Sequence, residues 1–563
     1  MKNKIFQFLA LMFLLSASVY SQIVDTTTLN ANLNPIGVTG TLTLDSTKIY
    51  KMIGYFFVQS GGTINIPSGT IIRGDKLTKG SLIILRGGKI YARGTSTRPI
   101  VFTSNLPPGQ RAAGDWGGII IIGKATINTY TGSDTAICEG VVPDIYYGGH
   151  DDNDNSGVLQ YVRSEFAGIP LSPNNEINGI TFYSVGRGTT VDHLMVSYSG
   201  DDSYEWFGGT VNGKYFIAFN GLDDDFDDSF GFRGKMQFCL GVRTPGIADV
   251  SGSHFWESDN NEFAQGSSTL FNANSPRTQS LWANITSIGP KEFDTSTISS
   301  NFSGTIRERR WSLRSCWDGI FMGWNKGYRI DGIGCMQAAF GDTIKFISNI
   351  LAGISGNTWD TLSNGGYGFN FPAWGMSPGR QNDTFALNTE VMLVNPYNQT
   401  RSTANFMPIS GSPAFNHFTD PSTVDPFFTS TNYRGAFGSV DWGSGSWTNW
   451  RPDTVDYTHP IGIQPISTEV PANFSLKQNY PNPFNPSTTI KFDISRQSFV
   501  LLKVYDVIGR LISTPVNENL QTGKYAISFD GFNLPSGTYF YKINVSSSDG
   551  SSWSDTKKMI LVK

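Results

Sequence analysis

The densest group of chemically active side chains is a run of carboxylates between residues 201 and 228, where Lys214 is the only basic residue. Residues 193–202 align with residues 215–224, so that apolar positions and an acidic pair recur 22 positions apart. A second register lays residues 201–204 on residues 227–230. We therefore expect neighbouring structural repeats to bring together the acids of this run: Asp201, Asp202, Glu205, Asp223, Asp224, Asp225, Asp227 and Asp228.

Like charges stacked on adjacent strands repel unless they are protonated, hydrated or bridged by a cation. Calcium takes about six to eight oxygen ligands in adaptable geometry, which makes a Ca²⁺ site one hypothesis for these eight residues. A solvated acidic face is the alternative, and both stay open. Residues 152–157 open like an EF-type calcium loop, but Arg163 stands where such a loop needs Glu, which favours a turn rich in Asp and Asn.

The same acids suggest an enzymatic alternative. Glycoside hydrolases use pairs of carboxylates, one as the acid and one as the base. A calcium-dependent lyase would need a basic side chain beside the metal, and Arg233 or Lys235 could supply it. No catalytic residue is assigned. With five His and no Gly-x-Ser-x-Gly, His-Glu-x-x-His or phosphate-loop motif, other hydrolytic and nucleotide chemistry has little support.

The elements that position these acids form a regular pattern. Short β-rich runs at 63–66, 81–85, 100–103 and 119–122 return at a nearly constant interval, with turn residues such as Gly87 and Gly88 between them. This interval is too short for a strand–helix–strand unit and is typical of one turn of a parallel β-helix. The acidic residues would then lie at the corners of adjacent coils.

Composition agrees with an all-β protein. The chain of 563 residues has 13% aromatic residues, 62 Gly and 27 Pro, which suits short strands and tight turns. Only 42 Lys and Arg face 46 Asp and Glu, so no basic excess favours nucleic-acid binding. Beyond an N-terminal apolar stretch no long apolar run follows, and we expect no transmembrane segment.

The domain organisation predicted from these patterns has five parts. They are a signal peptide at 1–21, an N-terminal cap at 22–60, a parallel β-helix with an irregular closing region at 61–460, a linker at 461–473 and a C-terminal domain at 474–563. The Trp-rich run at 441–451 is predicted to close the far end of the solenoid. The four cysteines, Cys138, Cys239, Cys316 and Cys335, could form up to two disulfides in an exported protein. Cys316 and Cys335 lie about one coil apart, so that they could be bridged or could be two buried free thiols.

Several motifs resemble those of known families. Gly80-Ser81-Leu82-Ile83-Ile84, Pro99-Ile100-Val101-Phe102-Thr103-Ser104 and Gly114-Asp115-Trp116-Gly117-Gly118 look like the right-handed parallel β-helix of pectate-lyase-like proteins. Together with residues 200–209 and 433–437, they are similar to secreted bacterial β-helix proteins of undetermined activity. This resemblance implies a fold and little about function.

The C-terminal segment resembles the type A sorting domain of the type IX secretion system over its whole length. The matching residues are 479–486 (Asn-Tyr-Pro-Asn-Pro-Phe-Asn-Pro), 504–510 (Val-Tyr-Asp-Val-Ile-Gly-Arg) and 534–541 (Leu-Pro-Ser-Gly-Thr-Tyr-Phe-Tyr). The spacing of its strands predicts a small Ig-like β-sandwich. The resemblance implies the secretion machinery and a surface sortase as partners, and export through the periplasm to the outer-membrane surface or the medium.

We therefore expect an exported binding or structural protein of the adhesin type, at the cell surface or released, with an extracellular polysaccharide as one candidate partner. The alternative is a calcium-dependent polysaccharide lyase or a glycoside hydrolase of the β-helix class.

Overall fold

The structure is a computed structural model. It describes residues 26–30, 37–139, 141, 144–172, 175–261, 272–361, 368–397, 404–458, 464–467, 470–485, 487–531, 534–547 and 549–562. The predicted signal peptide at 1–21 lies outside these residues. Among the described residues, no helix has both the length and the apolar character needed to cross a bilayer.

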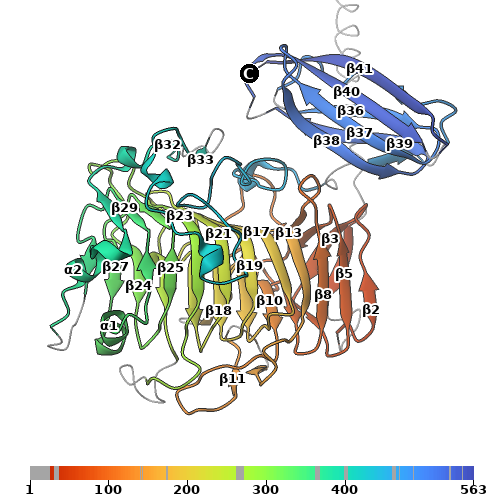
Figure 1. Cartoon of the computed structure of the whole chain (residues 1–563). Coiled ribbons are helices and arrows are strands. Elements are labelled where there is room, and N and C mark those ends of the chain that lie inside the picture. The colour runs from red at the N-terminus through yellow and green to blue at the C-terminus, as the bar shows by residue number, and fades with distance from the viewer. Residues whose placement is uncertain are drawn as a thin grey trace, which may run out of the picture.

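The body of the chain is a parallel β-helix, as predicted (Figure 1). One side of the solenoid is a ten-stranded parallel sheet. Its strands are β4 (Tyr55–Val58), β7 (Ser81–Ile84), β10 (Gly118–Ile122), β16 (Ile180–Tyr183), β18 (Tyr204–Phe207), β20 (Phe226–Ser229), β22 (Ser253–Ser258), β24 (Phe302–Glu308), β27 (Tyr328–Ile330) and β30 (Trp359–Asp360).

The second sheet has seventeen strands among the described residues. They are β1 (Thr26–Asn30), β2 (Thr41–Thr43), β3 (Ile49–Ile53), β5 (Thr63–Pro67), β6 (Ile71–Gly74), β8 (Lys89–Arg93), β9 (Ile100–Ser104), β13 (Gly157–Glu165), β17 (Thr190–Ser197), β19 (Asn212–Phe219), β21 (Lys235–Val242), β23 (Leu281–Ile288), β25 (Ser315–Trp317), β26 (Ile320–Met322), β28 (Phe346–Ile347), β29 (Ile350–Ala352) and β31 (Asp383–Phe385). Strands β2, β3 and β4 already pair with later coils, so the solenoid begins within the range expected for the cap.

The long strands of this sheet bend at one residue each. Tyr161, His193, Tyr215 and Phe238 occupy this corner with φ between 50° and 62°. Their rings stack at centroid distances of 4.2, 4.3 and 4.9 Å along the solenoid. The bend divides β13 into a half that pairs with β8 and a half that pairs with β9. The solenoid therefore has three faces.

One of these faces is covered by a returning segment, residues 404–458, which we call the strap. The outward residues of the second strand halves form a mainly apolar row that packs against Ala436, Phe437 and Trp447 of the strap. In order, the row contains Met195, Ile217, Leu240, Thr286, Ile320 and Ile350. At β13, Tyr457 Oη donates to Glu165 Oε1 at 2.8 Å. The strap reaches back further still, because Tyr457 also packs with Ile49 of β3, Ile71 of β6 and Val101 of β9.

The prediction that the Trp-rich run closes the far end was wrong. Asn449 N contacts Met195 Sδ at 3.4 Å and Trp447 meets the His193 ring edge-on at 5.2 Å, both in the middle of the solenoid. The run lies there because the apolar row needs a cover. The far end is instead packed by α2 (Phe371–Gly375), whose Phe371 ring lies 5.3 Å from that of Trp359 on β30.

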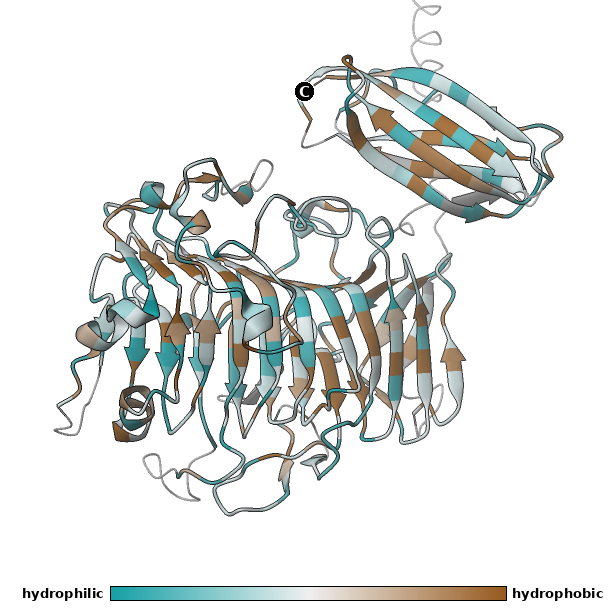
Figure 2. Ribbon diagram, viewed as in Figure 1, coloured by the Kyte–Doolittle hydropathy of each residue, from teal (hydrophilic) through white to brown (hydrophobic). Residues whose placement is uncertain are grey.

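The C-terminal part is a sandwich of two four-stranded antiparallel sheets. One sheet contains β34 (Gln464–Ser467), β39 (Gly523–Asp530), β36 (Ser487–Ile494) and β35 (Ser475–Leu476); the other contains β38 (Leu511–Leu520), β37 (Ser498–Tyr505), β40 (Gly537–Ser547) and β41 (Ser552–Leu561). Strand β34 lies in the range expected for the linker. Apolar residues alternate along these strands and form a separate core (Figure 2).

The remaining described strands form three hairpins: β11 (Thr135–Ile137) with β12 (Tyr146–Gly148), β14 (Pro170–Ser172) with β15 (Asn175–Glu176), and β32 (Leu393–Asn395) with β33 (Asn405–Pro408). Helix α1 (Ile333–Phe340) and strand β30 belong to the last coils. All four cysteines are buried and unbridged, which agrees with the free-thiol alternative.

Candidate metal centre

The outward side chains of the ten-stranded sheet form one continuous row. Strand pairing places them in the order Phe57, Ile83, Ile120, Thr181, Glu205, Asp227, Glu257, Arg307, Arg329 and Asp360. Alternate residues of the same strands, such as Tyr204 and Phe226, point into the core. The row therefore changes from apolar to acidic to basic along the solenoid.

Another segment of the chain covers the apolar end of the row. Ile83 and Ile120 pack with Ile127 and Tyr147, which belong to the segment containing the β11–β12 hairpin. After Thr181 the row is charged at every position.

The structure separates the eight predicted acids into two sets. Asp225 and Asp228 point inward. Asp225 pairs with the fully buried Arg243 at 2.9 Å, and Asp228 pairs with Arg314 at 2.8 Å. Burial raises the pKa of Asp225 to about 7 even though Arg243 opposes the shift. Since a cation already accompanies each of these carboxylates, they do not belong to a metal site.

The other acids gather at the corner and on the outer row. One oxygen from each of Asp201, Asp202 and Asp223 lies within 4.8 Å of the others, and the same holds for Asp202, Glu205 and Asp227. Burial, followed by repulsion from Asp224, raises the pKa of Asp223 to about 8. Burial and neighbouring acids also raise the pKa of Asp202, Glu205 and Asp227 well above the usual range. The largest charge effects on Asp202 come from other acids, and at Asp227 burial and the acids outweigh the charge of Arg309, so the protein does not hold these two carboxylates ionised.

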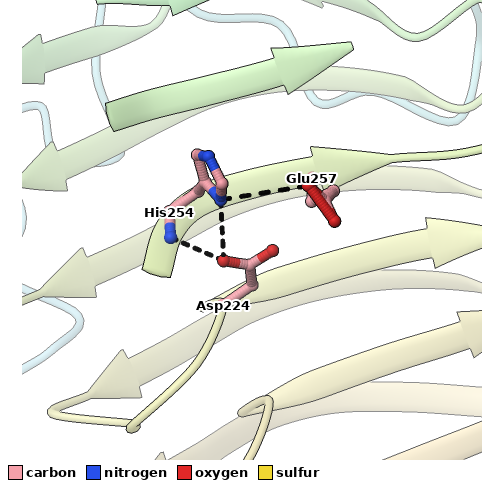
Figure 3. Close-up of side chains that lie close together, drawn as sticks. All are labelled: Asp224, His254 and Glu257. Carbon is pink, nitrogen blue, oxygen red and sulfur yellow. Dashed lines mark hydrogen bonds and ion pairs between the residues drawn. The ribbon is translucent and has the colours of Figure 1, made fainter. Parts of the chain in front are cut away.

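A third group, drawn in Figure 3, contains Asp224, His254 and Glu257. His254 Nδ1 lies 3.2 Å from Asp224 Oδ1 and 4.0 Å from Glu257 Oε1. Burial raises the pKa of Glu257, but the charges of Arg309, His254 and Arg307 outweigh it and lower the pKa to about 2. This group is charge-compensated by the protein itself, unlike the two groups that contain Asp202.

Sequence reasoning missed three residues of this region: Asn178, His254 and Glu257. Asn178 is 3% exposed, and its Nδ2 donates to Glu205 Oε2. The sequence signal for Glu257 and His254 is weak because they follow Asp227 and Asp224 by 30 positions, while neighbouring coils repeat at shorter intervals. Only the pairing of β20 with β22 brings them together.

Two oxygens at the Asp202–Glu205–Asp227 group have no hydrogen-bond partner. They are Asp227 Oδ1 and Asn178 Oδ1, both inaccessible to solvent. Buried polar atoms are rarely left unpaired, and an orphaned oxygen calls for a missing donor or cation.

The other sequence candidates serve the fold. Asp152 accepts both hydrogen bonds of Arg233 Nη2, at 3.0 and 3.1 Å, and Lys235 pairs with Asp425 at 2.6 Å. Asp154 accepts from Ser156 Oγ at 3.2 Å within its own turn. Arg233 and Lys235 are therefore engaged elsewhere and do not supply the base that the lyase alternative required. The loop at 152–157 is a hydrogen-bonded turn.

Comparison with known proteins identifies the family. The profile described as "Pectate-lyase like beta helix domain" matches residues 37–362. The chain belongs to this pectate-lyase-like β-helix family. The "Secretion system C-terminal sorting domain" profile matches residues 478–562, so this β-helix protein carries a type IX sorting domain and is exported to the cell surface or the extracellular space.

Other comparisons with this β-helix protein add little. No curated protein matches it. CopC from Methylosinus trichosporium OB3b aligns over 16% of this chain and 93% of its own, with 18% identity and a TM-score of 0.13. The cell-surface chitinase ChiW from Paenibacillus sp. str. FPU-7 aligns over 93% of this chain but 24% of its own, with 10% identity and a TM-score of 0.13. Both TM-scores are too low to support an argument.

Proposed function

We propose that this β-helix protein acts outside the cell as an adhesin-like binding or structural protein whose acidic corner holds calcium. One observation carries the proposal: Asp202, Glu205 and Asp227 converge within 4.8 Å, and the buried Oδ1 atoms of Asp227 and Asn178 have no partner. Leaving several buried carboxylates ionised without a cation is costly.

The ligand chemistry favours calcium. The two groups that share Asp202 offer only oxygen ligands, and carboxylate and amide oxygens are the ligands of hard cations. Calcium also tolerates irregular geometry, which suits ligands from two strands and two corners. Zinc would be favoured by nitrogen or sulfur ligands.

A bound calcium ion would leave coordination positions for oxygens of a partner. The outer row continues from the acids into Arg307 and Arg329, so a partner bridging both parts would need oxygen atoms along its length. An extracellular polysaccharide has this chemistry. Export through the periplasm, removal of residues 1–21 and cleavage by a surface sortase complete the proposal.

Titration calorimetry with calcium on the purified protein tests the proposal. We expect a saturable heat that is lost in Asp202→Asn and in Glu205→Gln, while Asp45→Asn, an exposed turn residue of the first coils, binds as the wild type does. An absence of heat in the wild type would reduce the acidic corner to a solvated face.

One observation favours the enzymatic alternative. Arg307 Nη1 lies 3.2 Å from Glu257 Oε1, directly beyond the acids in the outer row. A calcium-dependent polysaccharide lyase would need such an arginine as its base. The guanidinium of Arg307 is already engaged in ion pairs with Glu257 and Asp331. We therefore favour a binding protein over a lyase. Ultraviolet absorbance from unsaturated products, formed from acidic polysaccharides by the wild type and not by Arg307→Ala, would decide for the lyase.

A further inference from the structure

The three motifs of the sorting domain meet at one end of its sandwich. Tyr505, next to the turn at 506–510, pairs with Phe540 of β40. Thr538 at the start of β40 pairs with Ile560 near the end of β41, and Val562 N donates to Phe484 O at 3.0 Å. This is the end at which the C-terminus lies in Figure 1.

The polar residues of the 506–510 turn hold its shape. Asp506 Oδ1 accepts from the backbone N–H groups of Ile508 at 3.1 Å and Arg510 at 2.9 Å, and its Oδ2 pairs with Arg510 Nε at 3.0 Å. Gly509 adopts φ of 81°, a conformation that other residues rarely adopt. Asp506, Gly509 and Arg510 are thus accounted for by the local structure.

The local structure does not account for the exposure of the apolar residues in the same turn. Val507 is 67% exposed and Ile508 is 80% exposed, although the turn that presents them is rigidly hydrogen-bonded. Leu511 and Val562, at the same end, are each 49% exposed. Among the other motif residues, Phe484 and Tyr539 are buried in the sandwich core, whereas Tyr480 is 82% exposed. Val507, Ile508 and Leu511 lie within five positions of one hairpin, and adjacent exposed apolar groups on a fixed turn mark an interaction surface.

We propose that this apolar tip, formed by Val507, Ile508 and Leu511, is the surface by which the type IX secretion machinery recognises the protein. The match to the sorting-domain profile over residues 478–562 identifies the class of partner. The partner is a protein component of that machinery with an apolar recess that receives the turn. This proposal is independent of the calcium site.

The test is secretion of the full chain by a bacterium with its own type IX system, measured as the ratio of extracellular to cell-retained protein. Replacing both Val507 and Ile508 with Asp is expected to lower this ratio about tenfold or more, as loss of a central apolar anchor does in protein interfaces. The matched control is Phe499→Asp. Phe499 is also exposed and on β37, but it pairs with Ser546 toward the opposite end of the sandwich. The Phe499→Asp variant is expected to be secreted as efficiently as the wild type.

A second double variant, Val507→Ser with Ile508→Ser, removes the apolar contact without adding charge. Thermal melting of each purified full-length variant checks that the sandwich still folds, which the exposure of both side chains leads us to expect. Retention of both double variants with unchanged melting supports the proposal. Wild-type secretion of the serine variant, or equal retention of Phe499→Asp, would overturn it.

Discussion

Two outward rows of side chains on the same solenoid differ in whether the chain covers them. On the face under the strap, Met195, Ile217 and Leu240 follow one another and are buried by residues 404–458. On the ten-stranded sheet, Glu205, Asp227 and Glu257 follow one another in equivalent coils. The chain devotes a long segment to covering the first row, whereas the second row carries charges that the protein compensates only in part.

The difference separates structural from functional charge. Inside the solenoid, two of the eight predicted acids have an arginine beside them: Asp225 pairs with Arg243 and Asp228 pairs with Arg314. Toward the basic end of the outer row, Arg329 pairs with Asp360 at 2.6 Å. At Asp202, Glu205 and Asp227 the neighbouring acids and burial instead raise the pKa of each carboxyl well above its usual range. This local deficit of positive charge is what a cation would correct.

The largest expected effect comes from detaching the strap. Arg434 is fully buried and pairs with Asp383 at 2.7 Å, while the next residue, Gly435, donates its N–H to Asp318 O at 2.7 Å. Arg434→Ala removes this ion pair, the hydrogen bond from Arg434 Nη2 to Pro413 O at 2.6 Å and the packing of a fully buried side chain, and should cost about 4 kcal/mol in the free energy of unfolding. Urea denaturation measures this. A cost no larger than that of the exposed Arg93→Ala would mean that the strap is not anchored there.

A smaller effect is expected from the covered row itself. Ile217→Ala leaves a cavity beneath the strap and should lower the free energy of unfolding by about 3 kcal/mol. Leu77, which is 94% exposed, provides the control, because Leu77→Ala should change stability by less than about 0.5 kcal/mol. Equal effects of the two substitutions would show that the apolar row is not buried in solution.

On the charged row, loss of the Asp227 carboxylate should change stability in opposite directions with and without calcium. In chelator, Asp227→Asn removes repulsion with Glu205 and Glu257 and should stabilise the protein by about 1 kcal/mol. In calcium the same substitution should be destabilising relative to the wild type. Asp360→Asn, in the same row but paired with Arg329, should destabilise under both conditions. Thermal melting with and without calcium measures both, and matching behaviour of the two variants would contradict the account.

A further expected effect is a dependence on pH. The pKa of Asp223 is about 8 in the folded protein and near 3.8 when unfolded, so between these values the folded state holds a proton that the unfolded state lacks. Stability in chelator should therefore fall as pH rises from 5 to 8, and calcium should reduce the slope. Glu257, with a pKa lowered to about 2, contributes only below this window. A stability that rises with pH in chelator would argue against the raised pKa values.

The sequence predicted the solenoid because its strand repeat is local, and it predicted the acids because they occur in two aligned runs. It could not assign Asp225 and Asp228 to the interior, since a single step along a strand moves a side chain to the opposite face. Asn178, His254 and Glu257 come from coils of different length, so only strand pairing reveals them. The prediction for the Trp-rich run at 441–451 was wrong because the row that it covers lies more than 200 positions earlier in the chain, as the contact of Trp447 with His193 shows.

Melting of the full-length protein at pH 8 in calcium and in chelator tests the central claim most directly. A cation that binds only the folded state stabilises it by RT ln(1 + [L]/Kd), about 2.7 kcal/mol at a hundredfold excess over Kd. The account predicts a saturable rise in Tm with calcium that disappears when Glu205→Gln and Asp227→Asn are combined. An identical Tm in calcium and chelator for the wild-type protein would contradict it.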